Sequence, residues 1–298
     1  MGKASKRRTT RLDRETGTGT GMTFAEPAPF VARPFAELPD ETEWVALREI
    51  LPAATASVRL AEPRGGIQTA TITTVLPLAW PALHRQGHDV FVATQSGATS
   101  GDASRDLAAA LLLACDAEEG TPVTVVPTPI ASSPRLQDLL DTSSPFEVEL
   151  HDGFDFWVAD MDLDDEGQAS LERANESVVP TARVKGVTSA YWCLIGERAY
   201  VRWVLPHDED LATNALARLH AAGRSRLTPD ARLLGAFRAS GLLVPVWEVP
   251  RDVVVDDVVA PVAAMGEAIQ EAAASSTPLD ADERRARAGL QSRQVTLR

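Results

Sequence analysis

Cysteine and long apolar runs are both scarce in this sequence. Cys115 and Cys193 are the only thiols among 298 residues, too few for the disulfide framework of a secreted protein. We expect both to be reduced and buried, with a single bridge as the alternative. The longest apolar run, 107–115, has about half the length that a bilayer requires, and residues 15–30, after the basic head, contain no apolar run. We therefore expect a cytoplasmic protein with no signal peptide and no membrane insertion.

Sequence motifs of several enzyme classes are absent as well. The chain has no G-x-x-x-x-G-K-[ST] phosphate loop, no G-x-S-x-G nucleophile elbow and no paired cysteines with zinc-ligand spacing. We expect no metal and no cofactor. The sequence leaves the catalytic residues unknown and favours a non-enzymatic protein.

Charge is present in excess and is unevenly placed. The net charge is -13, yet residues 1–14 carry six basic residues and one acid, and residues 284–298 carry five arginines and no acid. The body between these ends therefore has a net charge of -23. Such a body repels phosphate backbones, so any nucleic-acid contact is expected to begin at the ends.

Local patterns predict a mixture of helices and strands. Asp40 and Glu43 have the spacing of a capping box, and Trp44, Leu47 and Leu51 lie along one face of the helix that follows. The apolar stripe from Leu107 to Cys115 predicts a second helix. We expect further helices at 168–177, 211–222, 229–241 and near 134, strands at 55–61, 67–76, 89–95, 122–126, 146–150, 153–159 and 242–249, and a strand turning into a helix at 253–275.

The clearest hairpin joins 188–195 to 198–205 through Gly196-Glu197, the Gly-X pair that a type II′ turn prefers. Alternation then places Trp192 and Leu194 on one face with Val201, and Tyr191, Cys193, Tyr200 and Arg202 on the other. Pro245 predicts an edge position or a bulge for the strand at 242–249.

The order of these elements predicts an α+β fold with pseudo-duplicated halves, in which antiparallel hairpins are flanked by helices. TATITTVLP and SPRLQDLLDTSSPFEVEL in the first half parallel AYVRWVLP and DARLLGAFRASGLLVPVWEV in the second. We expect a disordered basic tail at 1–34, an N-terminal half at 35–178, a C-terminal half at 179–275 and a basic, frayed C-terminal tail at 276–298.

Four stretches taken together point to a family: MGKASKR, FAELPDETEWVALREILPAATASVRL, GDASRDLAAAL and GLLVPVWEVP. In this combination the chain resembles an uncharacterised, domain-of-unknown-function family of high-GC Gram-positive (actinobacterial) proteins. Some of its members are automatically labelled preprotein translocase, SecA-type. The family has no established catalytic residues, so the resemblance implies none here. Because the phosphate loop and the zinc tail are missing, we do not expect the chemistry of a translocase motor.

Three short patterns suggest ligand sites but have simpler interpretations. His84 and His88 have zinc-ligand spacing on a helix, but Gly87 favours a loop with two solvated imidazoles. Asp160, Asp162 and Asp164 alternate as in a calcium loop, but a solvated acidic turn that leads into a helix N-terminus, where carboxylates oppose the positive end of the dipole, is favoured. The loop 96–101, with Arg105 one turn later, could cradle an anion, although a connector capped by Ser100 or Asp102 is favoured.

Three function hypotheses follow from these observations. The leading one is a non-enzymatic interaction or regulatory protein with an unknown protein partner. The second is RNA or ribosome contact, in which Tyr191, Tyr200 and Arg202 stack and bind unpaired bases, unless a helix covers this face. The third is a small-molecule enzyme of unrecognised type near His84, His88 or the loop 96–102. In the second hypothesis the basic head also contacts the RNA phosphates, through Lys3, Lys6, Arg7, Arg8 and Arg11.

Overall fold

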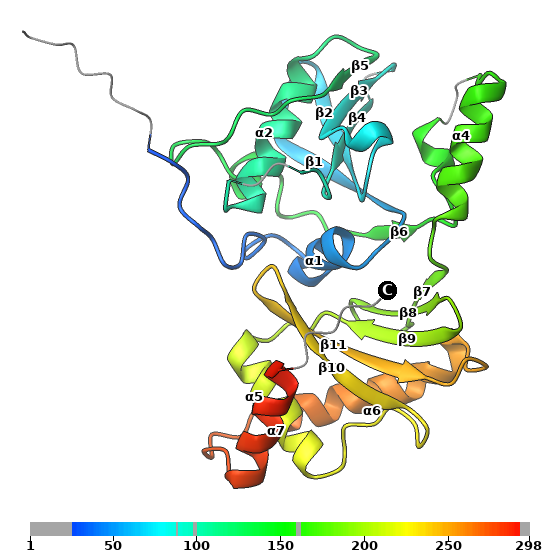
Figure 1. The fold of residues 1–298 in the computed structure, drawn as a ribbon. Helices are drawn as coiled ribbons and strands as arrows, with labels where there is room; N and C mark the ends of the chain where they lie inside the picture. Colours follow the sequence, from blue (N-terminus) through cyan, green and yellow to red (C-terminus); the bar gives the residue numbers. More distant parts are fainter. Residues whose placement is uncertain (1–25, 88, 98–99, 159–161, 293–298) are drawn as a thin grey trace, which may run out of the picture.

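The computed structural model describes residues 26–87, 89–97, 100–158 and 162–292. These residues form an α+β fold of two halves, each built on one β-sheet (Figure 1). The expectation of an α+β fold is therefore confirmed. Within the described residues, no helix is long and apolar enough to cross a bilayer. The basic head lies outside the described residues.

The first half contains a mixed sheet of strand order β5-β3-β4-β2-β1-β6. β1 and β2 form an antiparallel hairpin, and β2 pairs in parallel with β4. Buried residues of α2 pack against β1, β2 and β4 in one core. The elements are α1 (Glu41–Glu49), β1 (Ala54–Arg64), β2 (Ile67–Thr73), η1 (Pro77–Ala79), β3 (Ala82–Arg85), β4 (Asp89–Ala93), α2 (Ala103–Asp116), β5 (Thr121–Val123), α3 (Leu136–Leu139) and β6 (Val148–Leu150).

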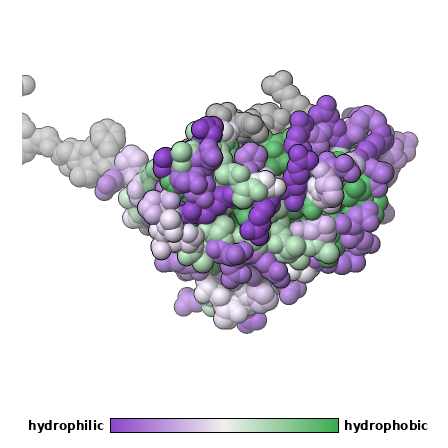
Figure 2. Space-filling model, turned by 90° about the horizontal axis from the view of Figure 1, so that it is seen from below, coloured by the Kyte–Doolittle hydropathy of each residue, from purple (hydrophilic) through white to green (hydrophobic). Residues whose placement is uncertain are grey.

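The second half follows a short acidic arm and contains an antiparallel sheet of order β10-β11-β9-β8-β7. α5 and α6 bury one face of this sheet, and α7 packs on α5. Seen from below, this half carries mostly hydrophilic side chains with apolar ones between them (Figure 2). The arm contains η2 (Asp155–Trp157) and α4 (Asp165–Glu176), which pack on the first half. The elements of the second half are β7 (Thr181–Arg183), β8 (Ala190–Ile195), β9 (Arg198–Trp203), α5 (Glu209–Ala221), β10 (Arg232–Ala239), β11 (Leu242–Val249), α6 (Val255–Ala273) and α7 (Ala281–Ser292).

Helix α1 lies between the two halves (Figure 1). Residues 42–47 are all buried, so this helix has no solvated face along that stretch. Trp44 is stacked between Phe35 and Phe146, with ring centroids 5.7 and 3.8 Å away. The same core reaches Tyr191 of β8 and Val244 of β11 in the second half. A helix buried on every side must be surrounded by other elements, and here both halves surround it.

Several predicted elements are confirmed. The hairpin of β8 and β9 pairs Tyr191 with Arg202 and Cys193 with Tyr200, as the alternation required. Gly196 has a φ of 58°, which the first residue of a type II′ turn needs. The helices predicted at the apolar stripe and from Leu211 onwards correspond to α2 and α5.

Other predictions are wrong, and tertiary pairing explains most of them. Residues 229–241, predicted as a helix, contain β10, because the chain turns at Ser240-Gly241 and pairs with β11. β11 is an interior strand, so the edge alternative for Pro245 is wrong. The bulge alternative fits, because the register of β10 and β11 shifts between Leu233 and Gly235, next to the position that pairs with Pro245. Residues 153–159 include the 3-10 turn η2 instead of a strand, and 255–273 are helical throughout.

The ends of the two halves also differ from expectation. The segment 281–292, expected to fray, forms α7, and its Leu290 is buried against the second core. The second pair of segments compared as a repeat folds differently, since one forms α3 and β6 and the other the β10–β11 hairpin.

The predicted capping box is wrong too. Asp40 has a φ of 53°, and its carboxylate accepts a hydrogen bond from the Phe146 N–H at 2.9 Å. The Glu43 carboxylate accepts hydrogen bonds from the second half instead.

The tip of the β10–β11 hairpin rests on the segment that precedes α1. Pro34 accepts hydrogen bonds from Arg135 at 2.8 Å and Gln137 at 3.0 Å, which fixes this segment on the first half. Gly241 has a φ of 80°, and a Cβ there would lie 2.5 Å from the Ala32 carbonyl oxygen. The absence of a side chain at this turn therefore allows the second half to approach the first.

We predict that Gly241→Ala lowers the free energy of unfolding by about 2–3 kcal/mol, because it combines an unfavourable φ with a backbone clash. Gly196→Ala is the matched control. It has a φ of 58° with no other atom within 4 Å of the added Cβ, and should cost only about 1 kcal/mol. Urea unfolding of both variants measures the difference. Equal losses would show that the hairpin tip does not press on Ala32.

Candidate functional site

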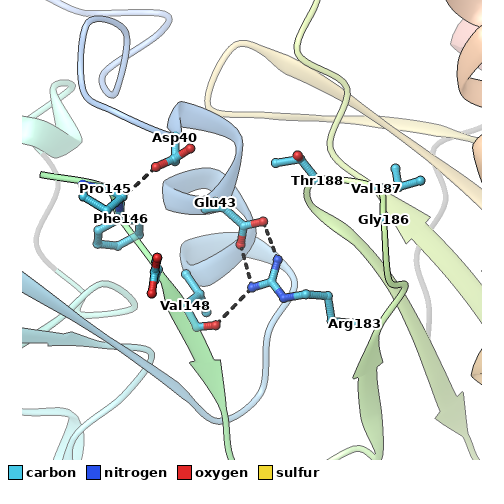
Figure 3. A pocket seen from close by; sticks show the side chains of 10 residues that line it. Asp40, Glu43, Pro145, Phe146, Val148, Arg183, Gly186, Val187 and Thr188 are labelled. Carbon is cyan, nitrogen blue, oxygen red and sulfur yellow. Dashed lines mark hydrogen bonds and ion pairs between the residues drawn. The ribbon is translucent and has the colours of Figure 1, made fainter.

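A buried carboxylate joins the two halves. Glu43 of α1 is 4% exposed and lies among donors from the second half (Figure 3). Arg183 of β7 donates from Nη1 to Oε1 at 2.6 Å and from Nη2 to Oε2 at 3.1 Å. Ser189 donates to Oε1 from its N–H at 3.0 Å and its hydroxyl at 2.9 Å, and the Tyr191 hydroxyl donates to Oε2 at 2.5 Å. Five hydrogen bonds therefore hold this single carboxylate.

Arg183 connects this carboxylate to a third element. Its Nη2 also donates to the Val148 carbonyl of β6 at 3.0 Å, and its guanidinium carbon lies 5.0 Å from the centre of the Tyr191 ring. β6 is an edge strand of the first sheet and β7 an edge strand of the second. The arginine therefore bridges two sheet edges as well as neutralising the buried acid.

The hydrogen bonds determine the protonation of the pair. Burial alone would raise the pKa of Glu43, but the hydrogen bonds from Arg183, Tyr191 and Ser189 outweigh burial and leave the pKa below its ordinary value. Burial and the nearby Glu43 charge raise the pKa of Tyr191 well above its usual range. At neutral pH the acid is therefore ionised and the phenol is a neutral donor.

A cleft of about 450 Å³ opens beside this ion pair (Figure 3). Exposed carboxylates of Asp40 and Glu147 lie on the side of the first half, and the β7–β8 turn forms the opposite side. Both halves therefore contribute to one surface that combines acidic, apolar and main-chain groups. Its lining consists of Asp40, Glu43, Pro145, Phe146, Glu147, Val148, Arg183, Gly186, Val187 and Thr188.

The aromatic face suggested for base stacking is covered. Tyr191 is 0% exposed and contacts Glu43, while Tyr200 is 6% exposed and packs with Cys193 and Val246. Arg202 is half-buried beside them. The structure thus has the alternative arrangement, in which a helix covers Tyr191, and neither ring is accessible to a base. Contact of the basic head with RNA stays a prediction, because Lys3, Lys6, Arg7, Arg8 and Arg11 lie outside the described residues.

The remaining candidates lie apart from the cleft. His84 is a buried residue of β3 whose Nδ1 lies 2.8 Å from the Ala117 carbonyl oxygen, so both the helical zinc pair and the solvated-loop interpretation are wrong for it. His88 lies outside the described residues. Cys115 and Cys193 are free and buried, as expected. Burial raises the pKa of Cys115 to about 11 and also raises the pKa of Cys193.

The loops that suggested ion binding have structural roles. Asp102 is fully buried, caps α2 through the Ser104 N–H at 3.1 Å, and pairs with Arg105. Arg105 thus binds the protein's own carboxylate, which agrees with the capped connector. Asp164 caps α4 through the Gly167 N–H at 2.8 Å, as the helix-start interpretation expected, while Asp160 is not described. Among the described residues, no three His, Cys, Asp or Glu side chains are grouped to hold a metal ion.

Sequence reasoning missed Glu43 and Arg183. Glu43 already had a local interpretation as a capping residue, and Arg183 lies in a stretch without any motif. They are 140 residues apart, so no local pattern relates them. The one signal in the sequence was an acid directly before the apolar run 44–47, and the structure buries Glu43 together with that run.

These features define an α+β protein of two sheet-containing halves, joined by a buried ion pair and separated beside it by an open cleft. The sequence profile of a family of unknown function, DUF5926, matches residues 34–298, and the chain belongs to this family. No curated protein and no solved structure matches the chain.

We predict that Glu43→Gln lowers the free energy of unfolding by about 2–3 kcal/mol, because it leaves the partly buried Arg183 without its counter-charge. The control is Asp116→Asn, which breaks an exposed arginine–carboxylate pair with Arg64 and should cost less than about 1 kcal/mol. Denaturant unfolding compares them. A loss for Glu43→Gln no larger than the control would contradict the role of the buried pair.

The same pair should make stability depend on pH. The pKa of Glu43 is lower in the folded than in the unfolded chain, so its stabilisation is present above the ordinary value of 4.5 and is lost as pH falls through the folded pKa. The stability difference between the wild type and Glu43→Gln should therefore shrink below about pH 4.5. Unfolding curves at a series of pH values test this, and a constant difference would contradict it.

Proposed function

We propose that this protein is a non-enzymatic interaction module that binds a segment of a protein partner in the cleft between its halves. The observation that carries this proposal is that the buried carboxylate at the cleft, Glu43, and the buried phenol bonded to it, Tyr191, are both committed to structural hydrogen bonds. Every oxygen of Glu43 accepts hydrogen bonds, and its pKa and that of Tyr191 are shifted away from neutrality in opposite directions. A general acid or base needs a pKa near the working pH, so this arrangement favours recognition over proton transfer.

The cleft offers the groups that recognise an extended, positively charged segment. Asp40 and Glu147 place carboxylates at its rim, and Pro145 and Val187 add apolar surface. β6 and β7 are edge strands, whose outward main-chain groups can pair with a peptide. The body charge of -23 would draw a cationic partner towards the cleft.

An occupant of this cleft would contact both halves at once. Because the lining comes from α1 and β6 on one side and the β7–β8 turn on the other, binding would favour the arrangement in which the halves are held together. This supports a regulatory role. We place the module in the cytoplasm, a setting that two free, buried thiols suit.

We predict that Thr188→Arg abolishes partner binding by filling the cleft. Thr188 is exposed, so the variant should fold normally, whereas Thr142→Arg places the same side chain on an exposed loop outside the cleft. The tagged full chain and both variants are compared by quantitative affinity purification from lysate of the source cells. Partners retained by the wild type and Thr142→Arg but lost by Thr188→Arg are expected.

A second pair of variants tests the charge. Glu147→Lys, at the cleft, should weaken the binding of the same partners about tenfold. Glu62→Lys, at an exposed position on β1, should leave their binding unchanged. An identical set of partners for all the variants would exclude the cleft as the binding site.

A further inference from the structure

A second surface lies on the first half, around the turn that follows β2. Leu78 in η1 is 87% exposed, the most exposed of the large apolar residues among those described. Leu78 and Ala79 have φ values of 54° and 56°, a left-handed conformation in which Cβ crowds the following carbonyl. The fold therefore holds a leucine in an unfavourable conformation and leaves it in water. Neither the left-handed φ nor the exposed leucine stabilises the fold, which favours a role for Leu78 in a contact with another molecule.

Aromatic side chains lie on both sides of this turn in the cluster of Leu76, Phe91 and Ala93. Trp80 is half-buried two residues after Leu78, and Phe156 and Trp157 of η2 are half-buried against the same cluster. Trp157 Nε1 donates to the Val75 carbonyl at 2.9 Å, and Arg85 donates to the Phe156 carbonyl at 3.1 Å. These bonds fix η2 against the turn. We call the surface formed by Leu78, Trp80, Phe156 and Trp157 the aromatic turn surface.

Negative charge borders the aromatic turn surface. Residues 147–176 contain eleven acids and one arginine. α4 carries four of these acids and packs through Leu171 on the cluster that contains Phe156 and Trp157. Arg85, which donates to the Phe156 carbonyl, is paired with Asp89 at 2.5 Å and lies over the Phe91 ring. An apolar centre beside carboxylates complements an apolar side chain flanked by lysine or arginine.

We propose that the aromatic turn surface docks a positively charged segment of a protein partner, which places an apolar side chain against Leu78 and Trp80 and its cations against the acids of α4. This is a second binding surface, separate from the cleft, so the chain would act as an adaptor with two contacts. The same acids repel anionic lipid headgroups and phosphate backbones, so the charge favours a basic protein segment over a membrane or a nucleic acid.

The test uses the full chain and a fluorescein-labelled helical peptide of lysine, leucine and one tryptophan, followed by fluorescence anisotropy. A peptide with glutamate in place of lysine is the comparison. The lysine peptide should bind the wild-type chain. Leu78→Ser should weaken the affinity for this peptide about tenfold. Leu211→Ser, at another exposed leucine on α5, should leave the affinity unchanged. Glu172→Lys combined with Glu176→Lys should also weaken it.

Leu78→Gly separates binding from folding. Glycine adopts a φ of 54° without crowding, so this variant should keep or raise the melting temperature while it loses the peptide. A lower melting temperature with unchanged binding would overturn the proposal, as would equal binding of the glutamate peptide or an equal loss in Leu211→Ser. Tighter binding after reversing the charges of Lys6, Arg7 and Arg8 would also overturn it, because the basic head would then be the occupant.

Discussion

The arrangement of this molecule depends on how one carboxylate is buried between its halves. An ionised acid loses several kcal/mol of hydration when it is removed from water, unless donors replace the lost hydrogen bonds. For Glu43 all five donors belong to β7, β8 and the turn between them, while the acid itself belongs to α1. The carboxylate is thus satisfied only in the orientation that brings these elements together. The cleft beside it is a consequence of that orientation.

Apolar packing around α1 supports the same arrangement. Residues 42–47 are buried on all sides, and one continuous core extends from α2 through α1 to β8 and β11. Trp44 fills the space between Phe35 and Phe146 on the side of the first half. Apolar contacts are not directional, so they hold the halves together without fixing their angle. The ion pair of Glu43 and Arg183 supplies the direction.

The acidic residues of the body are clustered in one part of the structure. Much of the acidic excess of the body is concentrated at 147–176, which includes β6 at the edge of the cleft and the exposed helix α4 beside the aromatic turn surface. The two proposed binding surfaces are therefore both acidic, and both include apolar groups. A cationic partner would meet the same kind of surface at both places, which would give the -23 body a role in recognition as well as in solubility.

The sequence by itself determined the features that depend on neighbours along the chain. Alternation and the Gly196 turn defined the β8–β9 hairpin and its faces, the apolar stripe defined α2, and Asp102 and Asp164 were foreseen at helix starts. These signals extend over only a few residues, so they can be interpreted without the fold.

Only the tertiary structure decided the features that depend on distant residues. Glu43 had a valid local interpretation as a capping residue, and its partners 140 to 148 residues away removed it from that role. The helical pattern at 229–241 gave way to pairing with β11, and Tyr191 became covered when α1 packed on its face. In each case burial against a remote element outweighed a local preference, because propensities differ by less than packing and ion pairing contribute.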